Sequence, residues 1–191
     1  MSAGNQYQAV VIGSSAGGLN ALKKLFIRLK ATFSLPVIIV QHISPDADNY
    51  LVHILNDQHK IEVMEAEEKI KPEPGKAYVA PPNYHLLIEP DRTFSLTIDE
   101  RVNYARPSID VLFETAADAY RDQLIGIILT GANNDGSKGL KRIKEMGGIT
   151  IVQDPGTAEV DSMPCAAIRA HKVDKILTIE EIADFLNSMQ S

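Results

Sequence analysis

Cysteine, tryptophan and long apolar runs are scarce or absent in this 191-residue chain, and each shortage excludes a class of protein. The single cysteine, Cys165, excludes an intramolecular disulfide and fits a reducing compartment. The apolar runs are far shorter than the roughly 20 residues of a membrane-spanning helix. Residues 1–7 carry no cationic segment followed by an apolar core, so no secretory signal is visible. We expect a cytoplasmic protein with no membrane insertion.

Basic residues are also in short supply. The chain has 19 Lys and Arg against 25 Asp and Glu, a formal net charge of −6, and its basic residues form no stripe among aromatic ones. This balance disfavours a nucleic-acid partner. Apolar residues, in contrast, make up 45% of the chain, which is enough for the core of one globular α/β domain. We expect residues 1–191 to form a single domain.

Apolar runs and helical patterns alternate along the chain. Short apolar runs predict strands at 9–12, 36–40, 61–63, 77–80, 124–129, 149–152 and 175–177. Helical spacing predicts helices at 19–29, 49–55, 109–120, 139–146 and 163–168, and Thr178 to Glu181 is a capping box that opens a last helix. The segments 84–89 and 93–98 flank a turn and predict an antiparallel hairpin. Together they predict an α/β fold with a doubly wound, mostly parallel sheet.

A glycine-rich turn follows the first predicted strand and contains Ser15. The pattern Gly13-x-Ser15-x-Gly17-Gly18 suits either a phosphate site at a helix N-terminus or an exposed serine nucleophile. The dinucleotide fingerprint needs glycine where Ser15 stands and an acid after the second strand, where this chain has Gln41-His42. The serine hypothesis is therefore favoured over dinucleotide binding.

Three polar residues follow predicted strands of one sheet: Ser15, His42 and Asp135. Strand carboxyl ends meet at one edge of a doubly wound sheet, so these side chains are candidates for a nucleophile, its base and an orienting acid. The backbone N–H of Ala16 is a candidate oxyanion donor. The alternatives are a helix cap at Ser15, a structural histidine and a turn aspartate, and sequence patterns alone leave them open.

Several segments together resemble the CheB chemotaxis methylesterases. They are residues 12–18 around Ser15, Gln41-His42, Tyr78-Val79-Ala80-Pro81-Pro82-Asn83-Tyr84-His85-Leu86, residues 106–113, residues 129–136 and residues 154–164. The resemblance implies Ser15 as nucleophile, His42 as base and Asp135 as orienting acid, with no metal and no organic cofactor. It implies hydrolysis of γ-glutamyl methyl esters on the cytoplasmic helices of methyl-accepting chemoreceptors, and in some members deamidation of receptor glutamines.

This sequence departs from the family pattern in two ways. Family members usually read Thr-Gly-Met-Gly-x-Asp-Gly around the acid, whereas Ala132 and Asn133 replace the methionine and glycine here. Chemotaxis members also carry an N-terminal receiver domain, whereas the first strand here is predicted to begin at Ala9. We therefore expect a catalytic domain without a receiver domain, whose control would come from a separate regulatory or kinase chain.

Further residues are candidates for substrate or oxyanion contacts. Ala132 and Asn134 lie in the loop around Asp135, and Arg106 precedes a predicted helix, where it could steer an acidic receptor segment. A surface role explains Arg106 equally well, and turn preference explains Asn134. The altered loop also leaves open a second hypothesis: a non-catalytic signalling module that keeps the fold and binds a partner.

Overall fold

A computed structural model describes residues 7–43, 50–57 and 60–189 of the chain. Its elements, in chain order, are β1 (Ala9–Ser14), α1 (Gly18–Arg28), β2 (Val37–Gln41), α2 (Tyr50–Asn56), β3 (Glu62–Glu65), β4 (Lys76–Val79), β5 (His85–Ile88), β6 (Phe94–Thr97), α3 (Ile109–Tyr120), β7 (Leu124–Ile128), α4 (Ser137–Glu145), β8 (Ile149–Gln153), α5 (Ser162–Ala170), β9 (Lys175–Leu177) and α6 (Ile179–Ser188). Within these residues, no helix is long and apolar enough to cross a membrane.

Seven of the strands form one parallel sheet, in the order β3-β4-β2-β1-β7-β8-β9. The chain first places β2, β3 and β4 on one side of β1, with β4 between β2 and the edge strand β3, and then adds β7, β8 and β9 in turn on the other side. The strand order therefore reverses at β1, and a reversal of this kind opens a crevice at the strand carboxyl ends of doubly wound folds. This confirms the predicted fold class.

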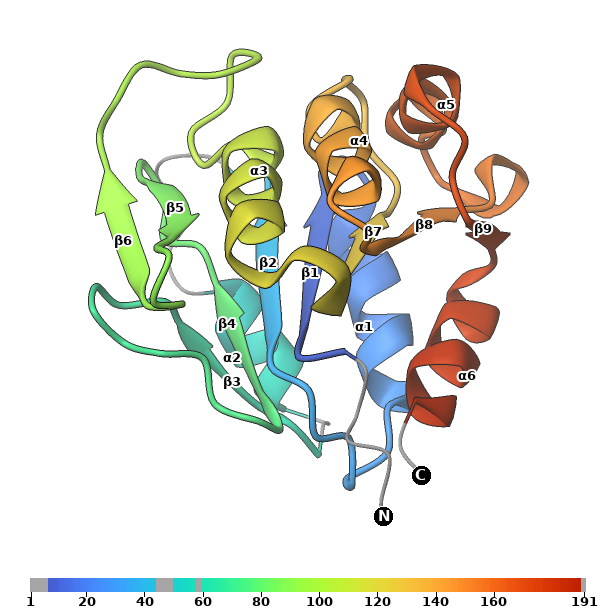
Figure 1. The fold of residues 1–191 in the computed structure, drawn as a ribbon. Coiled ribbons are helices and arrows are strands. Elements are labelled where there is room, and N and C mark those ends of the chain that lie inside the picture. The colour runs from blue at the N-terminus through green and yellow to red at the C-terminus, as the bar shows by residue number, and fades with distance from the viewer. Residues whose placement is uncertain (1–6, 44–49, 58–59, 190–191) are drawn as a thin grey trace.

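Both faces of the sheet are buried, as its continuous apolar strands require. Val10 and Ile12 of β1 pack into one core with α1, α2 and α6, whereas Ala9 and Val11 pack into a second core with α3, α4 and α5. Figure 1 shows α3 and α4 over the face turned to the viewer and α1 behind the sheet. Each large side chain buried in these cores contributes about 1.5–3 kcal/mol of transfer free energy.

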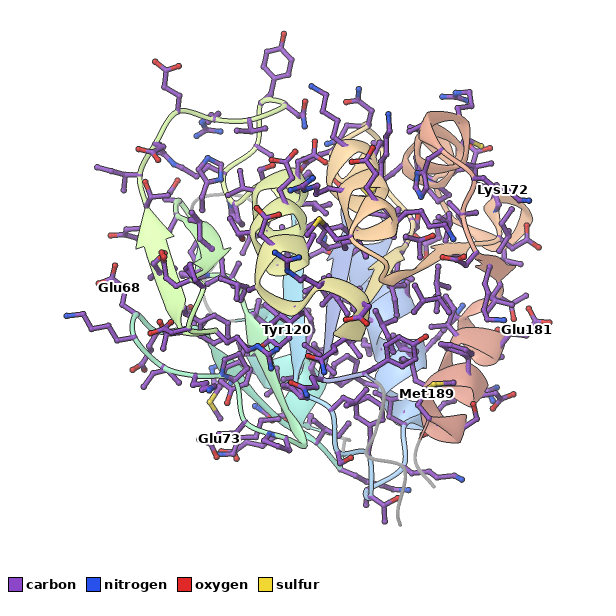
Figure 2. All side chains as sticks on the ribbon, in the orientation of Figure 1. Glu68, Glu73, Tyr120, Lys172, Glu181 and Met189 are labelled. Carbon is purple, nitrogen blue, oxygen red and sulfur yellow. The ribbon has the colours of Figure 1, made fainter. Side chains whose placement is uncertain are left out.

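Charged side chains lie outside these cores. Glu68, Glu73 and Glu181 are exposed and project outward from the ribbon, as Figure 2 shows. These three carboxylates therefore remain solvated, in contrast to the buried Asp110 and Asp135 of the site described below.

The predicted hairpin is also confirmed. β5 and β6 pair antiparallel as a separate two-stranded sheet, and Leu86 and Phe94 anchor it in the second core. After β6 the chain runs through residues 98–108 to the start of α3. This segment forms one wall of the site described below.

Most predicted boundaries shift by a few residues, and one shift matters for the site. β1 continues past Ile12, because Gly13 and Ser14 still pair with Val40 and Gln41 of β2. Position 13 requires glycine for close packing and not for a turn, because a Cβ there would lie 2.4 Å from the Ile109 side chain. The serine that leaves the sheet is therefore Ser15. Residues 44–46, whose sequence Ser-Pro-Asp is typical of a turn, lie outside the described residues.

Candidate active site

Ser15 is the first residue after β1. It is half-buried, and its backbone N–H donates to the carbonyl of Thr130 at 3.0 Å. The helix that follows has Gly17 as its N-cap, with φ 78° and no side-chain cap. Ser15 is therefore not the cap of α1, and the alternative structural reading of this serine is wrong. The exposed Ala16 lies in the turn between Ser15 and the helix.

Gln41 fixes the backbone of Ser15 beside that of His42. Its side-chain Nε2 donates to the carbonyl oxygens of Ser15 at 2.8 Å and His42 at 2.9 Å, while its Oε1 accepts from the buried Ser14 hydroxyl. The N–H of His42 also donates to the carbonyl of Ser14 at 3.0 Å. Gly18 leaves room for the Gln41 side chain, since a Cβ at position 18 would lie 1.9 Å from Gln41 Oε1.

His42 and Asp135 meet in a short contact across the sheet edge. The Nε2 atom of the imidazole lies 2.7 Å from Asp135 Oδ2, and the two side chains are 13% and 0% exposed. His42 follows β2 and Asp135 follows β7, so the two strands that flank β1 deliver this pair. The structure thus brings together two of the three predicted residues, 93 positions apart in sequence.

The Asp135 carboxylate also sits at the beginning of α3. It accepts from the backbone N–H groups of Ile109 at 2.7 Å and Asp110 at 3.1 Å, and from the Ser108 hydroxyl at 2.8 Å and Asn103 Nδ2 at 3.0 Å. The positive end of the helix dipole faces the same group.

Burial alone would raise the pKa of the Asp135 carboxyl. The hydrogen bonds from His42, the Ile109 N–H, Asn103 and the Asp110 N–H outweigh that effect and hold the pKa below its ordinary value. The side chain is therefore a carboxylate at neutral pH. It can therefore accept a hydrogen bond from the N–H of the His42 imidazole.

A set of polar groups supports Asp135 from behind, and the sequence alone gave no sign of it. Asn103 Nδ2 also donates to Asp110 Oδ2 at 2.8 Å, so one carboxamide bridges two buried carboxylates. Asp110 Oδ1 accepts from the Gly139 N–H at 2.7 Å. The pKa of the Asp110 carboxyl is raised above its ordinary value, and burial is the largest cause. His85 accepts from the Ser108 N–H at 3.1 Å, which pins the start of α3.

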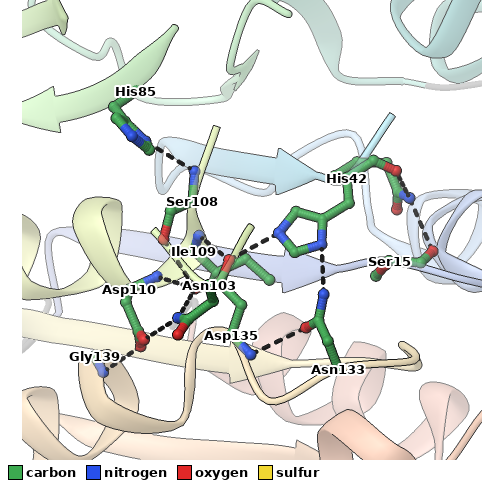
Figure 3. Close-up of polar contacts among 11 residues, drawn as sticks. Ser15, His42, His85, Asn103, Ser108, Ile109, Asp110, Asn133, Asp135 and Gly139 are labelled. Atoms are coloured by element: carbon green, nitrogen blue, oxygen red, sulfur yellow. Dashed lines mark hydrogen bonds and ion pairs between the residues drawn. The ribbon is translucent and has the colours of Figure 1, made fainter. Parts of the chain in front are cut away.

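Asn133 contacts the other nitrogen of the imidazole, as Figure 3 shows. Its Nδ2 lies 3.2 Å from His42 Nδ1, and its Oδ1 accepts from the Asp135 N–H at 3.0 Å. The second bond assigns the ends of the carboxamide, so the NH₂ group faces the imidazole. Nδ1 is then an acceptor, and the neutral ring carries its proton on Nε2, which donates to Asp135.

The Ser15 hydroxyl is not bonded to His42 in this structure. Among the described residues, the hydrogen bonds of the His42 ring run to Asp135 and Asn133. The backbones of Ser15 and His42 are nevertheless held side by side by Gln41 (Figure 3). Loose catalytic hydrogen bonds are common in unliganded enzymes, so the missing contact is compatible with a catalytic pair.

A cavity of about 180 Å³ adjoins the imidazole. His42, Asn103, Asn133, Arg101 and Arg106 line it together with Ile43, Tyr104, Ala105 and Pro107. The Arg106 guanidinium donates to the carbonyl oxygens of Ile98 at 2.8 Å and Asp99 at 3.1 Å. Arg106 therefore shapes the segment that walls the cavity.

The other predicted contact residues lie outside this cavity. Ala132 and Asn134 are exposed on the loop that carries Asp135. The residue of this loop that reaches the imidazole is Asn133, a position marked in the sequence by its departure from the family pattern. Within the described ranges, no three His, Cys, Asp or Glu side chains gather in a way that could hold a metal ion.

Comparisons with known proteins agree over nearly the whole chain. A profile described as CheB methylesterase matches residues 10–186. A Leptospira interrogans protein, provisionally named a protein-glutamate methylesterase/protein-glutamine glutaminase, is 57% identical over 93% of this chain and 92% of its own length. An Archaeoglobus fulgidus protein named a protein-glutamate methylesterase/protein-glutamine glutaminase is 38% identical over 92% of this chain and 51% of its own length.

The fold comparison agrees. The crystal structure of the Thermotoga maritima CheB methylesterase catalytic domain matches with a TM-score of 0.91 at 33% identity, covering 96% of this chain and 98% of that one. Sequence and fold give the same result, and the matched region includes Ser15, His42 and Asp135. The chain belongs to the CheB methylesterase family.

Proposed function

We propose that this protein is a serine esterase that hydrolyses γ-glutamyl methyl esters in protein substrates, with Ser15 as nucleophile, His42 as base and Asp135 as orienting acid. The observation that carries the proposal is the 2.7 Å contact between His42 and the buried Asp135, next to Ser15 at the reversal point of the sheet. The names and activities of the family relatives support the same reaction.

The contact between His42 Nε2 and Asp135 supports Nδ1 as the base nitrogen. Because Asp135 holds Nε2, the proton of the Ser15 hydroxyl passes to Nδ1, the reverse of the commoner arrangement in serine proteases. The Ser15 Oγ then attacks the ester carbonyl carbon and forms a tetrahedral intermediate. The imidazolium returns the proton to the methoxy oxygen, methanol leaves, and an acyl-enzyme remains.

Water completes the reaction by the same route. His42 takes a proton from a water molecule that attacks the acyl carbonyl carbon, and the proton then passes to Ser15 Oγ as the bond to the glutamyl group breaks. The negative charge of each tetrahedral intermediate develops near the N-terminus of α1. We infer that the Ala16 N–H and the helix dipole stabilise it, since Ala16 lies in the turn just before α1.

The proposed substrates are methylated glutamates on the cytoplasmic helices of a chemoreceptor, so the protein would act in the cytoplasm. A carboxamide differs from the ester in its leaving group, so the same site would deamidate receptor glutamines by releasing ammonia. We also propose that residues 1–191 form a single catalytic domain and that a separate regulatory or kinase chain controls it.

Methanol release from methylated receptor helices tests the assignment of Ser15. Loss of a serine nucleophile costs on the order of 10⁶ in turnover, so we expect Ser15→Ala to abolish release while the fold survives. Ser188→Ala is the matched control, because it removes an exposed hydroxyl at the end of α6 that donates to the Phe185 carbonyl. Its turnover should equal that of the wild type.

Two results would contradict the proposal. Equal methanol release by Ser15→Ala and wild type would exclude Ser15 as nucleophile. No release by either, with receptor binding unaffected by Ser15→Ala, would favour the non-catalytic binding module.

A further inference from the structure

Asn133 lies on the side of the imidazole opposite Asp135, and its orientation is fixed. Its Oδ1 accepts from the Asp135 N–H at 3.0 Å, and its Nδ2 lies 3.2 Å from His42 Nδ1. Exchanging the two ends of the carboxamide would place an NH₂ group against the Asp135 N–H. The donor end therefore stays at the imidazole.

The two neighbours of the imidazole favour opposite protonation states. Asp135 accepts from Nε2–H in both states and favours the imidazolium by its charge. Asn133 presents a donor to Nδ1, which accepts it only when that nitrogen is unprotonated. A proton on Nδ1 would place two donors in contact, so Asn133 favours the neutral ring.

Among the residues that the structure describes, three further charged groups belong to the surroundings of the imidazole. Arg101 and Arg106 line the adjoining cavity, and Arg106 is bound to backbone carbonyls. Asp110 lies behind Asp135, linked to it through Asn103. Replacing the Asn133 side chain leaves these three groups and Asp135 in place. A change in the titration of His42 would then report on the carboxamide itself.

We propose that Asn133 is a positioning residue that keeps the His42 imidazole neutral, with Nδ1 as an acceptor, and so lowers the pH at which the base becomes available to Ser15. The importance of this for turnover rests on the proposed function, in which His42 is the base. Because Nδ1 has a single lone pair in the ring plane, the hydrogen bond from Asn133 breaks before the Ser15 hydroxyl donates to Nδ1 and transfers its proton.

The test is a titration of the His42 ring by ¹⁵N NMR in the full chain. The variants are Asn133→Ala, which deletes the donor, and Asn133→Asp, which keeps the acceptor for the Asp135 N–H but replaces the donor by an oxygen. Asn134→Ala is the matched control, because it removes an exposed carboxamide from the same loop. Methanol release measured against pH provides the second readout.

We expect the midpoint of the imidazole titration to rise by about 0.5–1 pH unit in Asn133→Ala, the equivalent of one net hydrogen bond. In Asn133→Asp it should rise further, because a carboxylate accepts from Nδ1–H and adds negative charge. The control should titrate as the wild type does. The acidic limb of the kcat/KM profile should move in the same direction and by the same amount.

Wild-type midpoints in both folded Asn133 variants would overturn the proposal, as would a neutral wild-type ring with its proton on Nδ1. If Asn133→Ala does not fold, Asn133→Gly carries the test, because it also deletes the donor and adds no charge beside the imidazole. The titration needs no substrate. A shifted midpoint in a protein that releases no methanol would therefore support the role of Asn133 and refute the esterase.

Discussion

Replacing Asp135 by asparagine tests the electrostatic design of the site with almost no change in shape. The carboxylate is fully buried and receives two sets of donors. His42 Nε2 and the Ile109 N–H face Oδ2, while Oδ1 faces three donors, from Ser108, the Asp110 backbone and Asn103. A carboxamide must present its NH₂ group to one of these sets.

The cheaper orientation places the NH₂ group at the Oδ2 position. There it opposes a single fixed donor, the Ile109 N–H, and leaves that group unsatisfied at a cost of about 1–3 kcal/mol. At the Oδ1 position it would oppose both the Asp110 N–H and Asn103. For a chain of this size, each kcal/mol lowers Tm by about 2–4 °C.

The same orientation reverses the tautomer of His42. The ring must accept from the new NH₂ group through Nε2, so its proton moves to Nδ1, the nitrogen that should receive the proton of Ser15. There it breaks the hydrogen bond from Asn133 and adds to the cost of the substitution. We expect kcat to fall on the order of 10⁴, as a wrong tautomer costs in serine proteases. Methanol release and thermal unfolding measure the two effects. Asp118→Asn, which removes an exposed carboxylate paired with Arg142, is the control.

The pH dependence of stability gives a further check. The folded pKa of Asp135 lies below its unfolded value, so its ionised form contributes stability that is fully present above about pH 4 and lost as pH falls through the folded pKa. Asp135→Asn lacks this contribution, so the difference in unfolding free energy between the two proteins should shrink below about pH 4. A constant difference, or wild-type turnover in Asp135→Asn, would refute the reasoning.

Two smaller predictions concern the supports of the site. Ser108→Ala removes a hydroxyl that donates to the buried carboxylate, so the free energy of unfolding should fall by about 1.5–3 kcal/mol, with a smaller loss of turnover than in Asp135→Asn; unchanged denaturant unfolding would contradict this. Gly18→Ala places a Cβ 1.9 Å from Gln41 Oε1, so it should cost about 1–3 kcal/mol and slow methanol release by displacing Ser15 from His42. An unchanged rate in a folded Gly18→Ala protein would show that Gln41 does not position the two residues.

The pattern of apolar residues in short segments predicted the strands and helices well, because it reflects directly which side chains are buried. Val10, Ile12 and their neighbours are apolar without alternation, which only a strand covered on both faces requires, and both cores bear this out. The capping box at Thr178 and Glu181 is likewise a purely local device, and the structure contains it. The end of β1 was missed because Gly13 and Ser14 resemble turn residues, while their pairing with β2 is a tertiary fact.

The sequence by itself determined the class of fold, the family and the strand ends at which Ser15, His42 and Asp135 lie, because periodicity and short motifs depend on neighbours along the chain. Only the tertiary structure decided which imidazole nitrogen faces Asp135, that Asn103 and Ser108 hold the carboxylate, and that Asn133 faces the base. These contacts join residues far apart in sequence, and hydrogen-bond direction depends on side-chain orientation, which no linear pattern encodes.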